Sequence, residues 1–315
     1  MSTTRTIRWV LAHEPYDLFL RAAEKFASEV AEKTNNEIKI EVLGLTEYVD
    51  LYNNGQALDR YKIRELVDNG TIEMSQMYTT TLGLLDQDMF VLDMPFIFRD
   101  HEHAARVLDG EIGQELMDSL ASKSNIKGLA FTYSGGFRAI IGNRVIESID
   151  DMKGMTVRVA HCPVAEDTIR ALGAEPVVMP IEQLRDAIGS HTVDAGESTY
   201  PRIYGMKQNE TAGVINHTEH SLFLTTLIMN KGLWNDLTVE QQQIFRDAAL
   251  AAAHIERAES LEDVEITRDR AEKDGIRVVD LSDQTKQQFK QATQSIYSKY
   301  QNYFSNNLIN RIQQQ

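Results

Sequence analysis

Apolar residues follow two different periods along the first part of the chain, and the two alternate. Residues 7–12 are almost all apolar, and apolar side chains then recur at helical spacing from Phe19 to Val30, with Asp17 as the expected N-cap. Residues 37–43 are apolar at every second position, as in a strand with one buried face. A helix at about 57–69 and a strand at 71–77 continue the series. This order predicts an α/β fold with a mostly parallel sheet.

The middle of the chain repeats this alternation after a break. A helix is expected at about 101–122 and a strand at 128–133, followed by Gly135 and Gly136, which interrupt the strand pattern. We expect the chain to cross into a second domain at about residue 134. The later strands are expected at 138–142, 156–160, 175–179 and 222–230, and the helices at 163–172 and 181–190. The long apolar strand 222–230 is expected to return to the first domain.

The longest predicted element is a helix from Val239 to about Asp274. Thr238 is a suitable N-cap, with Gln241 three residues later, and the segment contains no proline. About 35 residues at ~1.5 Å each extend over about 50 Å. That length is enough to span two domains. A strand at 275–279 and a polar amphipathic helix from Ser282 complete the chain.

Composition limits the class of protein. The chain has 315 residues, 42% of them hydrophobic, which is enough for two domains with separate cores. A net charge of −15 argues against a nucleic-acid or anionic-membrane partner, and no apolar run is long enough for membrane insertion. The first six residues lack the apolar core of a signal peptide, so we expect a mature domain whose leader has been replaced. The single cysteine excludes an intrachain disulfide.

Arg158 is the first candidate for a functional residue. Val157 and Val159 are expected on one face of their strand and Arg158 on the other, close to the end of the strand and before Pro163. In open α/β sheets, ligands bind at the carboxyl ends of the strands. An alternative remains open, because arginine is mostly exposed and Arg158 could form a surface salt bridge instead.

No catalytic or metal-binding motif is present. The chain lacks the nucleophile elbow, the zinc-binding His-Glu-x-x-His and the glycine-rich phosphate loops. His101 and His103 are two residues apart on an expected helix, so they point in different directions and are read as solvated or capping residues. His217 and His220 fall in an expected loop. We therefore expect no enzyme, no cofactor and no metal.

The sequence between residues 134 and 197 carries a family resemblance. The quoted elements are Gly-Gly-Phe-Arg at 135–138, Met-Lys-Gly-Met-Thr-Val-Arg-Val at 152–159, Leu-Gly-Ala-Glu-Pro-Val-Val-Met-Pro at 172–180, Val-Asp at 193–194 and Glu197. Their order and spacing resemble the extracytoplasmic solute-binding proteins of TRAP transporters, the DctP family that binds C4-dicarboxylates and sialic acid. The resemblance extends over nearly the whole chain.

This resemblance implies a two-lobe fold like that of periplasmic binding proteins, with two strand crossovers and a long helix that spans the lobes. Lobe I is expected at 1–134 plus 223–262, and lobe II at 135–222 plus 263–315. Such a protein binds a small organic acid in the periplasm, closes about a hinge, and delivers the acid to TRAP membrane permease subunits. The alternatives are a ligand-sensing module for a membrane receptor and a hydrolase that uses Cys162 and His161, although sequence neighbours rarely meet in the required geometry.

The resemblance also assigns binding residues. The family's principal carboxylate-binding arginine falls on Arg158 and the second arginine on Arg138, and a guanidinium suits this task because its planar fork binds a carboxylate through two hydrogen bonds. The other expected ligand contacts are His13, Glu14, Tyr78, Thr79, Ile181, Ser198, Thr199 and Tyr200. Ser198 stands where relatives often have Asn or Gln, and Ile181 where many have Phe. His13 could instead be a core histidine, and Tyr78 could serve packing alone.

Overall fold

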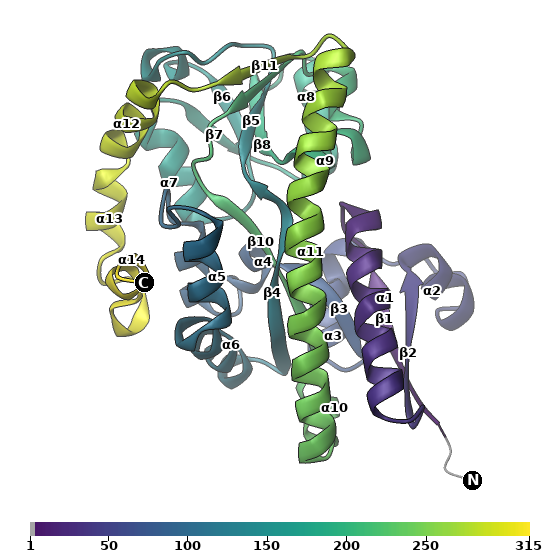
Figure 1. Ribbon diagram of the computed structural model, residues 1–315. Helices are drawn as coiled ribbons and strands as arrows, with labels where there is room; N and C mark the ends of the chain where they lie inside the picture. The colour runs from purple at the N-terminus through teal and green to yellow at the C-terminus, as the bar shows by residue number, and fades with distance from the viewer. Residues whose placement is uncertain (1–3) are drawn as a thin grey trace. The chain divides into compact units, whose positions relative to one another are not determined.

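The computed structural model describes residues 4–315 and divides into two compact units, each with one sheet and its own helices (Figure 1). The first unit comprises the residues up to Asp86, Leu108–Tyr133 and Leu224–Glu259. The second comprises Gln87–Val107, Ser134–Phe223 and Ser260–Gln315. The predicted α/β class is therefore confirmed. The predicted lobes are defined as the parts that move as rigid bodies, and the division into compact units does not test such motion. The lobe boundaries therefore stay a prediction.

The sheet of the first unit has the strand order β2-β1-β3-β10-β4. Strands β2, β1 and β3 are parallel, and β10 is antiparallel to β3. The elements are β1 (Arg5–Leu11), α1 (Tyr16–Lys33), β2 (Ile38–Gly44), α2 (Leu45–Tyr52), a 3₁₀ turn (Arg60–Lys62), α3 (Ile63–Asp68), β3 (Met74–Tyr78), α4 (Thr79–Leu82), α6 (Glu111–Lys123), β4 (Ile126–Phe137), β10 (Leu222–Asn230) and α10 (Lys231–Asn235). The predicted strands and helices exist, and α2 is an addition that the sequence analysis did not predict.

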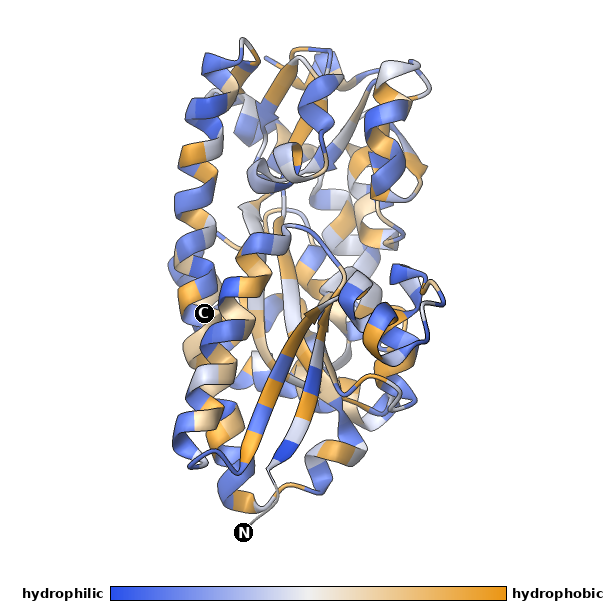
Figure 2. Ribbon diagram, turned by 90° about the vertical axis from the view of Figure 1, so that its right-hand side faces the viewer, coloured by the Kyte–Doolittle hydropathy of each residue, from blue (hydrophilic) through white to orange (hydrophobic). Residues whose placement is uncertain are grey.

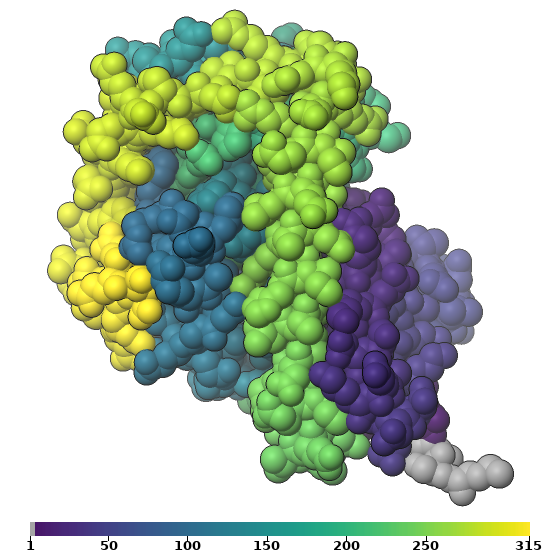
Figure 3. Space-filling model, viewed as in Figure 1, coloured from purple at the N-terminus to yellow at the C-terminus, as the bar shows by residue number. Residues whose placement is uncertain are grey.

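The core of the first unit lies between its sheet and two helices. Trp9 of β1 packs edge-on against Phe26 of α1, with 5.2 Å between ring centroids, and Phe26 packs against Phe245 of α11 (Val239–Lys273) at 5.4 Å. The alternating hydropathy that directs such side chains inward is visible along the strands in Figure 2. Helix α1 and the first part of α11 lie side by side, as Figure 3 shows.

The sheet of the second unit has the order β11-β9-β5-β8-β6-β7. Strand β6 is parallel to β7 and β8, β5 is antiparallel to β8 and β9, and β11 is parallel to β9. The elements are α5 (His101–Asp109), β5 (Ala139–Gly142), β6 (Thr156–Val159), α7 (Pro163–Ala171), β7 (Glu175–Val178), α8 (Leu184–Gly189), β8 (Ala195–Ser198), α9 (Tyr200–Gly205), β9 (Val214–His217), β11 (Arg277–Asp280), α12 (Asp283–Ala292), α13 (Gln294–Tyr300) and α14 (Leu308–Gln313), with 3₁₀ turns at Gln87–Asp93, Ile149–Met152, Ile181–Gln183, Gln208–Glu210 and Ser305–Asn307.

Strands β4 and β10 and helix α11 belong partly to each unit, because the division falls after Tyr133, Phe223 and Glu259. This confirms the predicted pair of strand crossovers and the shared long helix. The predicted break at the glycine pair is wrong, since β4 continues to Phe137. Gly135 has a φ of +92°, and a Cβ there would lie 2.5 Å from the hydroxyl oxygen of Thr199. The glycine therefore permits a close approach of chain segments within a continuous strand.

Helix α11 begins at the residue that the sequence predicts. The N–H of Gln241 donates to the hydroxyl of Thr238 at 3.2 Å, and the N–H of Thr238 donates to the side-chain oxygen of Gln241 at 3.1 Å. This reciprocal pair is a capping box, and it fixes the start of a helix of 35 residues. Within residues 4–315, no helix is both long enough and apolar enough to cross a membrane.

Three local predictions are wrong. The helix expected at 101–122 is two helices, α5 and α6, that meet at Gly110. Asp17 lies inside the first turn of α1, and the carboxylate of Glu14 accepts the N–H of Tyr16 instead. The solvated reading of His103 is wrong, because its ring is buried: Nδ1 accepts the N–H of Arg99 just before α5 at 3.1 Å, and Nε2–H donates to the carbonyl oxygen of Ile312 at 2.7 Å. The contact from His103 to Ile312 is a tertiary contact, which the local pattern does not encode, and it explains the last difference.

Candidate binding site

Arg158 and Arg138 lie at the same edge of the second unit's sheet. Arg158 is opposite Gly196 where β6 and β8 run parallel, so both strands end at this edge. Arg138 immediately precedes β5, which is antiparallel to β8 and pairs Ala139 with Ser198. Adjacent strands in the order β6, β8 and β5 thus bring two arginines that are 20 positions apart in the sequence to one edge.

Arg158 is buried, with a relative exposure of 5%. This excludes the alternative of an exposed strand arginine. Its Nε–H donates to the carbonyl oxygen of Met179 at 2.9 Å, which fixes the direction of the guanidinium. Gly196 leaves room beside it, because a Cβ at this position would lie 3.2 Å from the Cβ of Arg158 and 2.5 Å from Leu184. A glycine in β8 at this position therefore allows Arg158 and Leu184 to pack closely against that strand.

Arg138 is also buried, with a relative exposure of 2%, and it is surrounded by charged and aromatic groups. Its Nη2 donates to Oδ1 of Asp93 at 3.1 Å, and its Nη1 lies 3.9 Å from Oε2 of Glu197. The guanidinium carbon is 3.9 Å from the ring centroid of Phe223, the distance of a cation–π contact. Two carboxylates thus share the charge of one buried guanidinium.

A histidine completes this cluster behind Glu197. Nε2 of His220 lies 2.8 Å from Oε1 of Glu197, and Nδ1 of His220 lies 2.7 Å from the hydroxyl of Thr218. Burial opposes ionisation of Glu197, but Arg138 and His220 hold the pKa of its carboxyl below its ordinary value. Burial has the larger effect on Asp93 and raises its pKa to about 6, although Arg138 opposes the shift. Glu197 is the more strongly ionised of the two.

The four predicted contacts in the first unit also lie together. Strands β1 and β3 are parallel and end side by side, so His13 and Glu14 come close to Tyr78 and Thr79. The rings of His13 and Tyr78 are 5.0 Å apart, and the hydroxyl of Tyr78 donates to the carbonyl oxygen of Glu14 at 2.7 Å. Thr79 donates to the carbonyl oxygen of Leu224. Their role in ligand binding stays a prediction.

The other four residues predicted to contact the ligand interact with neighbouring residues of the second unit. Ser198 donates to the side-chain oxygen of Gln208 at 2.7 Å, and Thr199 donates to the carbonyl oxygen of Ser134 at 2.6 Å. Ile181 and Tyr200 belong to the hydrophobic core of this unit. A ligand role for these four residues also stays a prediction.

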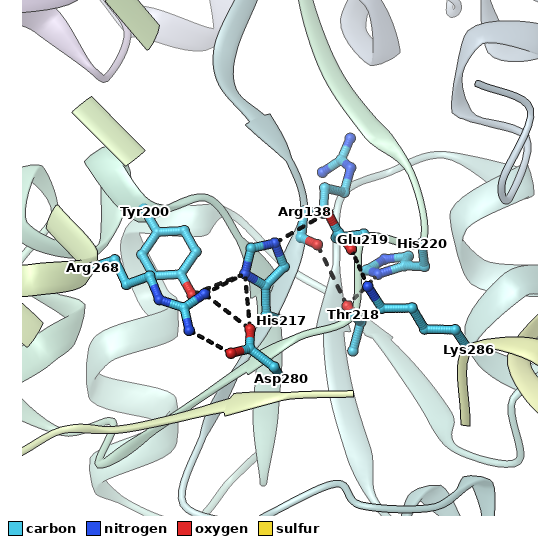
Figure 4. A network of polar contacts seen from close by, with 9 residues as sticks. All are labelled: Arg138, Tyr200, His217, Thr218, Glu219, His220, Arg268, Asp280 and Lys286. Atoms are coloured by element: carbon cyan, nitrogen blue, oxygen red, sulfur yellow. Dashed lines mark hydrogen bonds and ion pairs between the residues drawn. The ribbon is translucent and has the colours of Figure 1, made fainter. Parts of the chain in front are cut away.

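Tyr200 joins a second polar network, which Figure 4 shows together with Arg138, Thr218 and His220. The hydroxyl of Tyr200 and Nη1 of Arg268 each lie 3.3 Å from Nδ1 of His217. Arg268 also forms two hydrogen bonds to Asp280, whereas Nε2 of His217 faces Glu219 at 3.3 Å. The network connects β9, α9, α11 and β11 of the second unit, and its contacts indicate a structural role.

A pocket in the first unit was not predicted from the sequence. It has a volume of about 370 Å³ and is lined by Leu11, Ala12, Tyr16, Gly44, Leu45, Thr46, Glu47 and Arg60. The pocket lies where β1 and β2 end, the edge at which α/β sheets bind ligands. The turn after the strand at 37–43 could have indicated this position, but helix α2, which forms part of the wall, was missed.

The alternative chemistry has no support in the described geometry. The thiol of Cys162 is buried, and burial raises its pKa well above the ordinary value, so it is protonated and a poor nucleophile. His161, the neighbouring residue, is exposed. No three His, Cys, Asp or Glu side chains among residues 4–315 are grouped as ligands for a metal ion.

Comparison with known proteins agrees with the family resemblance of the sequence. The family described as bacterial extracellular solute-binding protein, family 7 (DctP), matches residues 12–303. The C4-dicarboxylate-binding protein DctB of Bacillus subtilis is 29% identical over 297 residues, 92% of this chain and 81% of that protein. The 2,3-diketo-L-gulonate-binding periplasmic protein YiaO of Escherichia coli is 28% identical over 259 residues, 82% of this chain and 76% of that protein.

Solved structures agree with these relatives. A TRAP periplasmic solute-binding protein from Pseudomonas putida F1 with bound D-glucuronate has a TM-score of 0.86 and 26% identity, covering 98% of this chain and 96% of that one. One from Polaromonas sp. JS666 bound to D-erythronate has the same TM-score and identity, with 98% of both chains covered. The likeness therefore extends over both units.

Proposed function

The chain belongs to family 7 of the bacterial extracellular solute-binding proteins, and from that premise we propose that it captures a small organic acid through the carboxylate of the ligand. The observation that carries this proposal is the meeting of two buried arginines, Arg158 and Arg138, at one edge of the second unit's sheet. A buried cation favours an anionic ligand, because its attraction is not screened by water.

The two arginines have unequal roles in this proposal. Arg138 shares its charge with Asp93 and Glu197, and the Nε–H of Arg158 donates to the neutral carbonyl of Met179. As the family resemblance implies, Arg158 is the principal partner of the ligand carboxylate in this proposal, and Arg138 assists. The first unit contributes His13, Glu14, Tyr78 and Thr79 from the ends of β1 and β3.

Delivery to a membrane transporter is the second part of the proposal. The predicted lobes close on the bound acid, and the closed form is recognised by the membrane permease subunits of a TRAP transporter outside the cytoplasmic membrane, in the periplasm. The ligand favours closure only as far as it binds the closed form more tightly than the open one. Support comes from the family and from relatives whose names include C4-dicarboxylate and 2,3-diketo-L-gulonate binding.

Catalysis is not part of this proposal, because Cys162 is buried and protonated. A binding protein returns its ligand chemically unchanged, so mass spectrometry of the ligand after incubation separates the two classes. A sensing module for a membrane receptor would use the same closing lobes. Assay of uptake with reconstituted permease subunits distinguishes transport from sensing.

The proposal is tested by a thermal-shift screen of the protein against organic acids and their amide counterparts. A ligand at 100 times its Kd stabilises the folded protein by about 2.7 kcal/mol. We expect acids to raise the melting temperature and the matched amides to have no effect. If acids and amides act alike, or if no acid acts on protein first stripped of ligand by unfolding and refolding, the proposal fails.

A further inference from the structure

The loop between β9 and β10 holds the main chain of Arg138 on both sides. The N–H of Arg138 donates to the carbonyl oxygen of Ser221 at 2.8 Å, and the carbonyl oxygen of Arg138 accepts the N–H of Glu219 at 3.1 Å. We call residues 218–221 the clamp loop. The position of the Arg138 main chain therefore depends on the conformation of this loop.

The clamp loop also contacts the surroundings of the Arg138 guanidinium. Nε2 of His220 lies 2.8 Å from Oε1 of Glu197, and the carbonyl oxygen of His220 accepts the N–H of Phe96 at 2.9 Å. Phe96 follows shortly after Asp93 in the chain. Glu197 and Asp93 are the two carboxylates that pair with Arg138. The loop thus contacts the arginine, one of its partners and the segment that carries the other.

Glu219 has an unusual backbone conformation within this loop. Its φ is +51°, in the left-handed region. This region is unfavourable for a residue with a Cβ atom and is populated mainly by glycine. An ordinary negative φ would change the path of the chain between the two hydrogen bonds to Arg138. Such a conformation persists only where surrounding contacts hold it.

The side chain of Glu219 has two such contacts (Figure 4). Nζ of Lys286 on α12 donates to Oε2 at 2.6 Å, and Nε2 of His217 lies 3.3 Å from Oε1. The hydrogen bond from His217 and the contact with Lys286 lower the pKa of Glu219 to about 2, although burial opposes the shift. The carboxylate is therefore ionised at neutral pH, and its ion pair connects the clamp loop to α12.

We propose that Glu219 and Lys286 are positioning residues for Arg138, because their ion pair holds the clamp loop in the conformation that fixes the arginine. This inference rests on the proposed function, since the position of Arg138 affects binding only where Arg138 assists in holding the ligand carboxylate. A binding residue that is fixed by its supporting contacts needs less ordering when the ligand arrives. Both positioning residues act through the main chain and not by touching the ligand.

Substitutions at Glu219 separate the side-chain contacts from the backbone conformation. Glu219→Ala removes both contacts and keeps a Cβ atom, so the left-handed conformation loses its support. Glu219→Gly removes the same contacts but permits the positive φ without the steric cost. Lys286→Met breaks the ion pair from the other side. Arg185→Met is the matched control, because its ion pairs are exposed and belong to the same unit.

The first measurement is amide hydrogen exchange of the ligand-free protein, followed by NMR. The rate at Arg138 is divided by the rate at Ile141 of β5, so that a change in global stability cancels. We expect this ratio to rise about fivefold or more in Glu219→Ala, the factor given by the lower end of the left-handed penalty. It should also rise in Lys286→Met and stay within about twofold in Glu219→Gly and Arg185→Met. Equal ratios in the alanine and glycine variants would overturn the inference.

The second measurement is calorimetric titration of the same variants with D-glucuronate, D-erythronate and succinate as probes. For an acid that binds the unmodified protein, Kd should rise about threefold or more in Glu219→Ala, because affinity falls with the fraction of binding-competent molecules. Kd should stay within about twofold in Glu219→Gly.

The two measurements separate this inference from the proposed function. If neither the exchange ratio nor Kd responds to Glu219→Ala and Lys286→Met, the inference is overturned and carboxylate capture stands. If the exchange ratio responds but Kd does not, Arg138 is held by the clamp loop without assisting the ligand, so the inference fails as an account of binding and capture by Arg158 alone stands. If none of the three acids binds the unmodified protein, the proposed function fails for these acids, and the exchange ratios still decide whether Glu219 positions Arg138.

Discussion

Each unit buries a polar cluster, and the two clusters differ in charge. The cluster of the first unit consists of Gln76, Thr132, Thr225 and Glu256. Gln76 Nε2 lies 2.7 Å from Oε1 of Glu256 and 3.0 Å from each threonine hydroxyl. Burial raises the pKa of Glu256 well above its ordinary value, because nearby hydrogen bonds are too weak to offset desolvation. This carboxyl is held protonated, as a neutral group.

In the second unit, the buried glutamate is kept charged instead of neutral. Glu197 is as completely buried as Glu256, yet Arg138 and His220 keep it ionised. The difference shows that burial alone does not decide the charge of a carboxyl group. The balance of burial against all nearby donors and cations does, since Arg138 and His220 together lower the pKa of Glu197, whereas Arg138 does not offset burial for Asp93. The neutral cluster suits a structural role, whereas the charged cluster can attract and orient a ligand.

Removal of the guanidinium should abolish the difference between the clusters. Arg138→Met leaves Asp93 and Glu197 buried without their cation, and we expect the free energy of unfolding to fall by about 3–5 kcal/mol. Urea denaturation measures this change. Arg185→Met is the control, because its ion pairs are exposed and contribute at most about 1 kcal/mol. Equal effects of the two substitutions would contradict the electrostatic explanation.

Arg158 extends the comparison, because we propose that it binds the ligand, whereas Arg138 pairs with buried carboxylates. Arg158→Ala should weaken binding of the acid identified by thermal shift by roughly 3 kcal/mol, or about a hundredfold. The unfolding free energy of the ligand-free protein should change less than in Arg138→Met, because Arg138 is hydrogen-bonded to Asp93 and paired with Glu197, both of which are buried. Isothermal titration and denaturation together check this. Unchanged affinity would refute the assignment.

The neutral cluster predicts a pH dependence with a definite sign. The pKa of Glu256 is higher in the folded state than the ordinary value of 4.5, so the folded state binds the proton more tightly. Stability is therefore lost as pH rises above about 4.5, by up to about 1.4 kcal/mol per pH unit. Glu256→Gln removes this loss, and we expect the variant to be more stable at pH 7, by up to about 3 kcal/mol, and equal near pH 4. Denaturation at both pH values checks it, and a pH-independent difference would contradict it.

The half-buried network around His217 should give the smallest effect on stability. The hydrogen bond from His217 and the charge of Lys286 lower the pKa of Glu219 to about 2, against burial. Its contribution to stability is thus present above about pH 4.5 and is lost as pH falls through about 2. Because Glu219 is more than one-third exposed, solvent screens the pair, and Glu219→Gln should lower stability by only about 0.5–1 kcal/mol at pH 7. High salt should shrink this difference, and a loss above 2 kcal/mol would refute the screening argument.

Local patterns were sufficient for much of the fold. Helix α11 was predictable because its cap and its uninterrupted helical sequence are local features. The two clusters were not predictable in this way. Gln76 and Glu256 are 180 positions apart, and Glu256 lies on a charged helix where its local sequence resembles that of exposed residues. Only the tertiary structure shows that this glutamate faces the interior.

The candidate site shows the same division. Arg158 was found from the strand pattern and the family resemblance, and Arg138 from the resemblance. Asp93 and His220 were missed, because both lie outside residues 134–197, which carry the quoted motifs, and His220 was expected in a loop. A signal existed: Asp93 precedes the apolar run Met94-Pro-Phe-Ile-Phe98, and a carboxylate in such surroundings needs a cationic partner.

The position of the only cysteine gives the molecule an internal reporter. The thiol of Cys162 is fully buried and senses the charges of Asp93, Arg138 and Glu197. An alkylating reagent can reach it only when this part of the second unit opens, so the rate of alkylation measures how often the charged interior is exposed to solvent. With one thiol in the chain, that rate is read without background from other sites. The factor by which a ligand slows alkylation of Cys162 thus measures how strongly that ligand suppresses local opening.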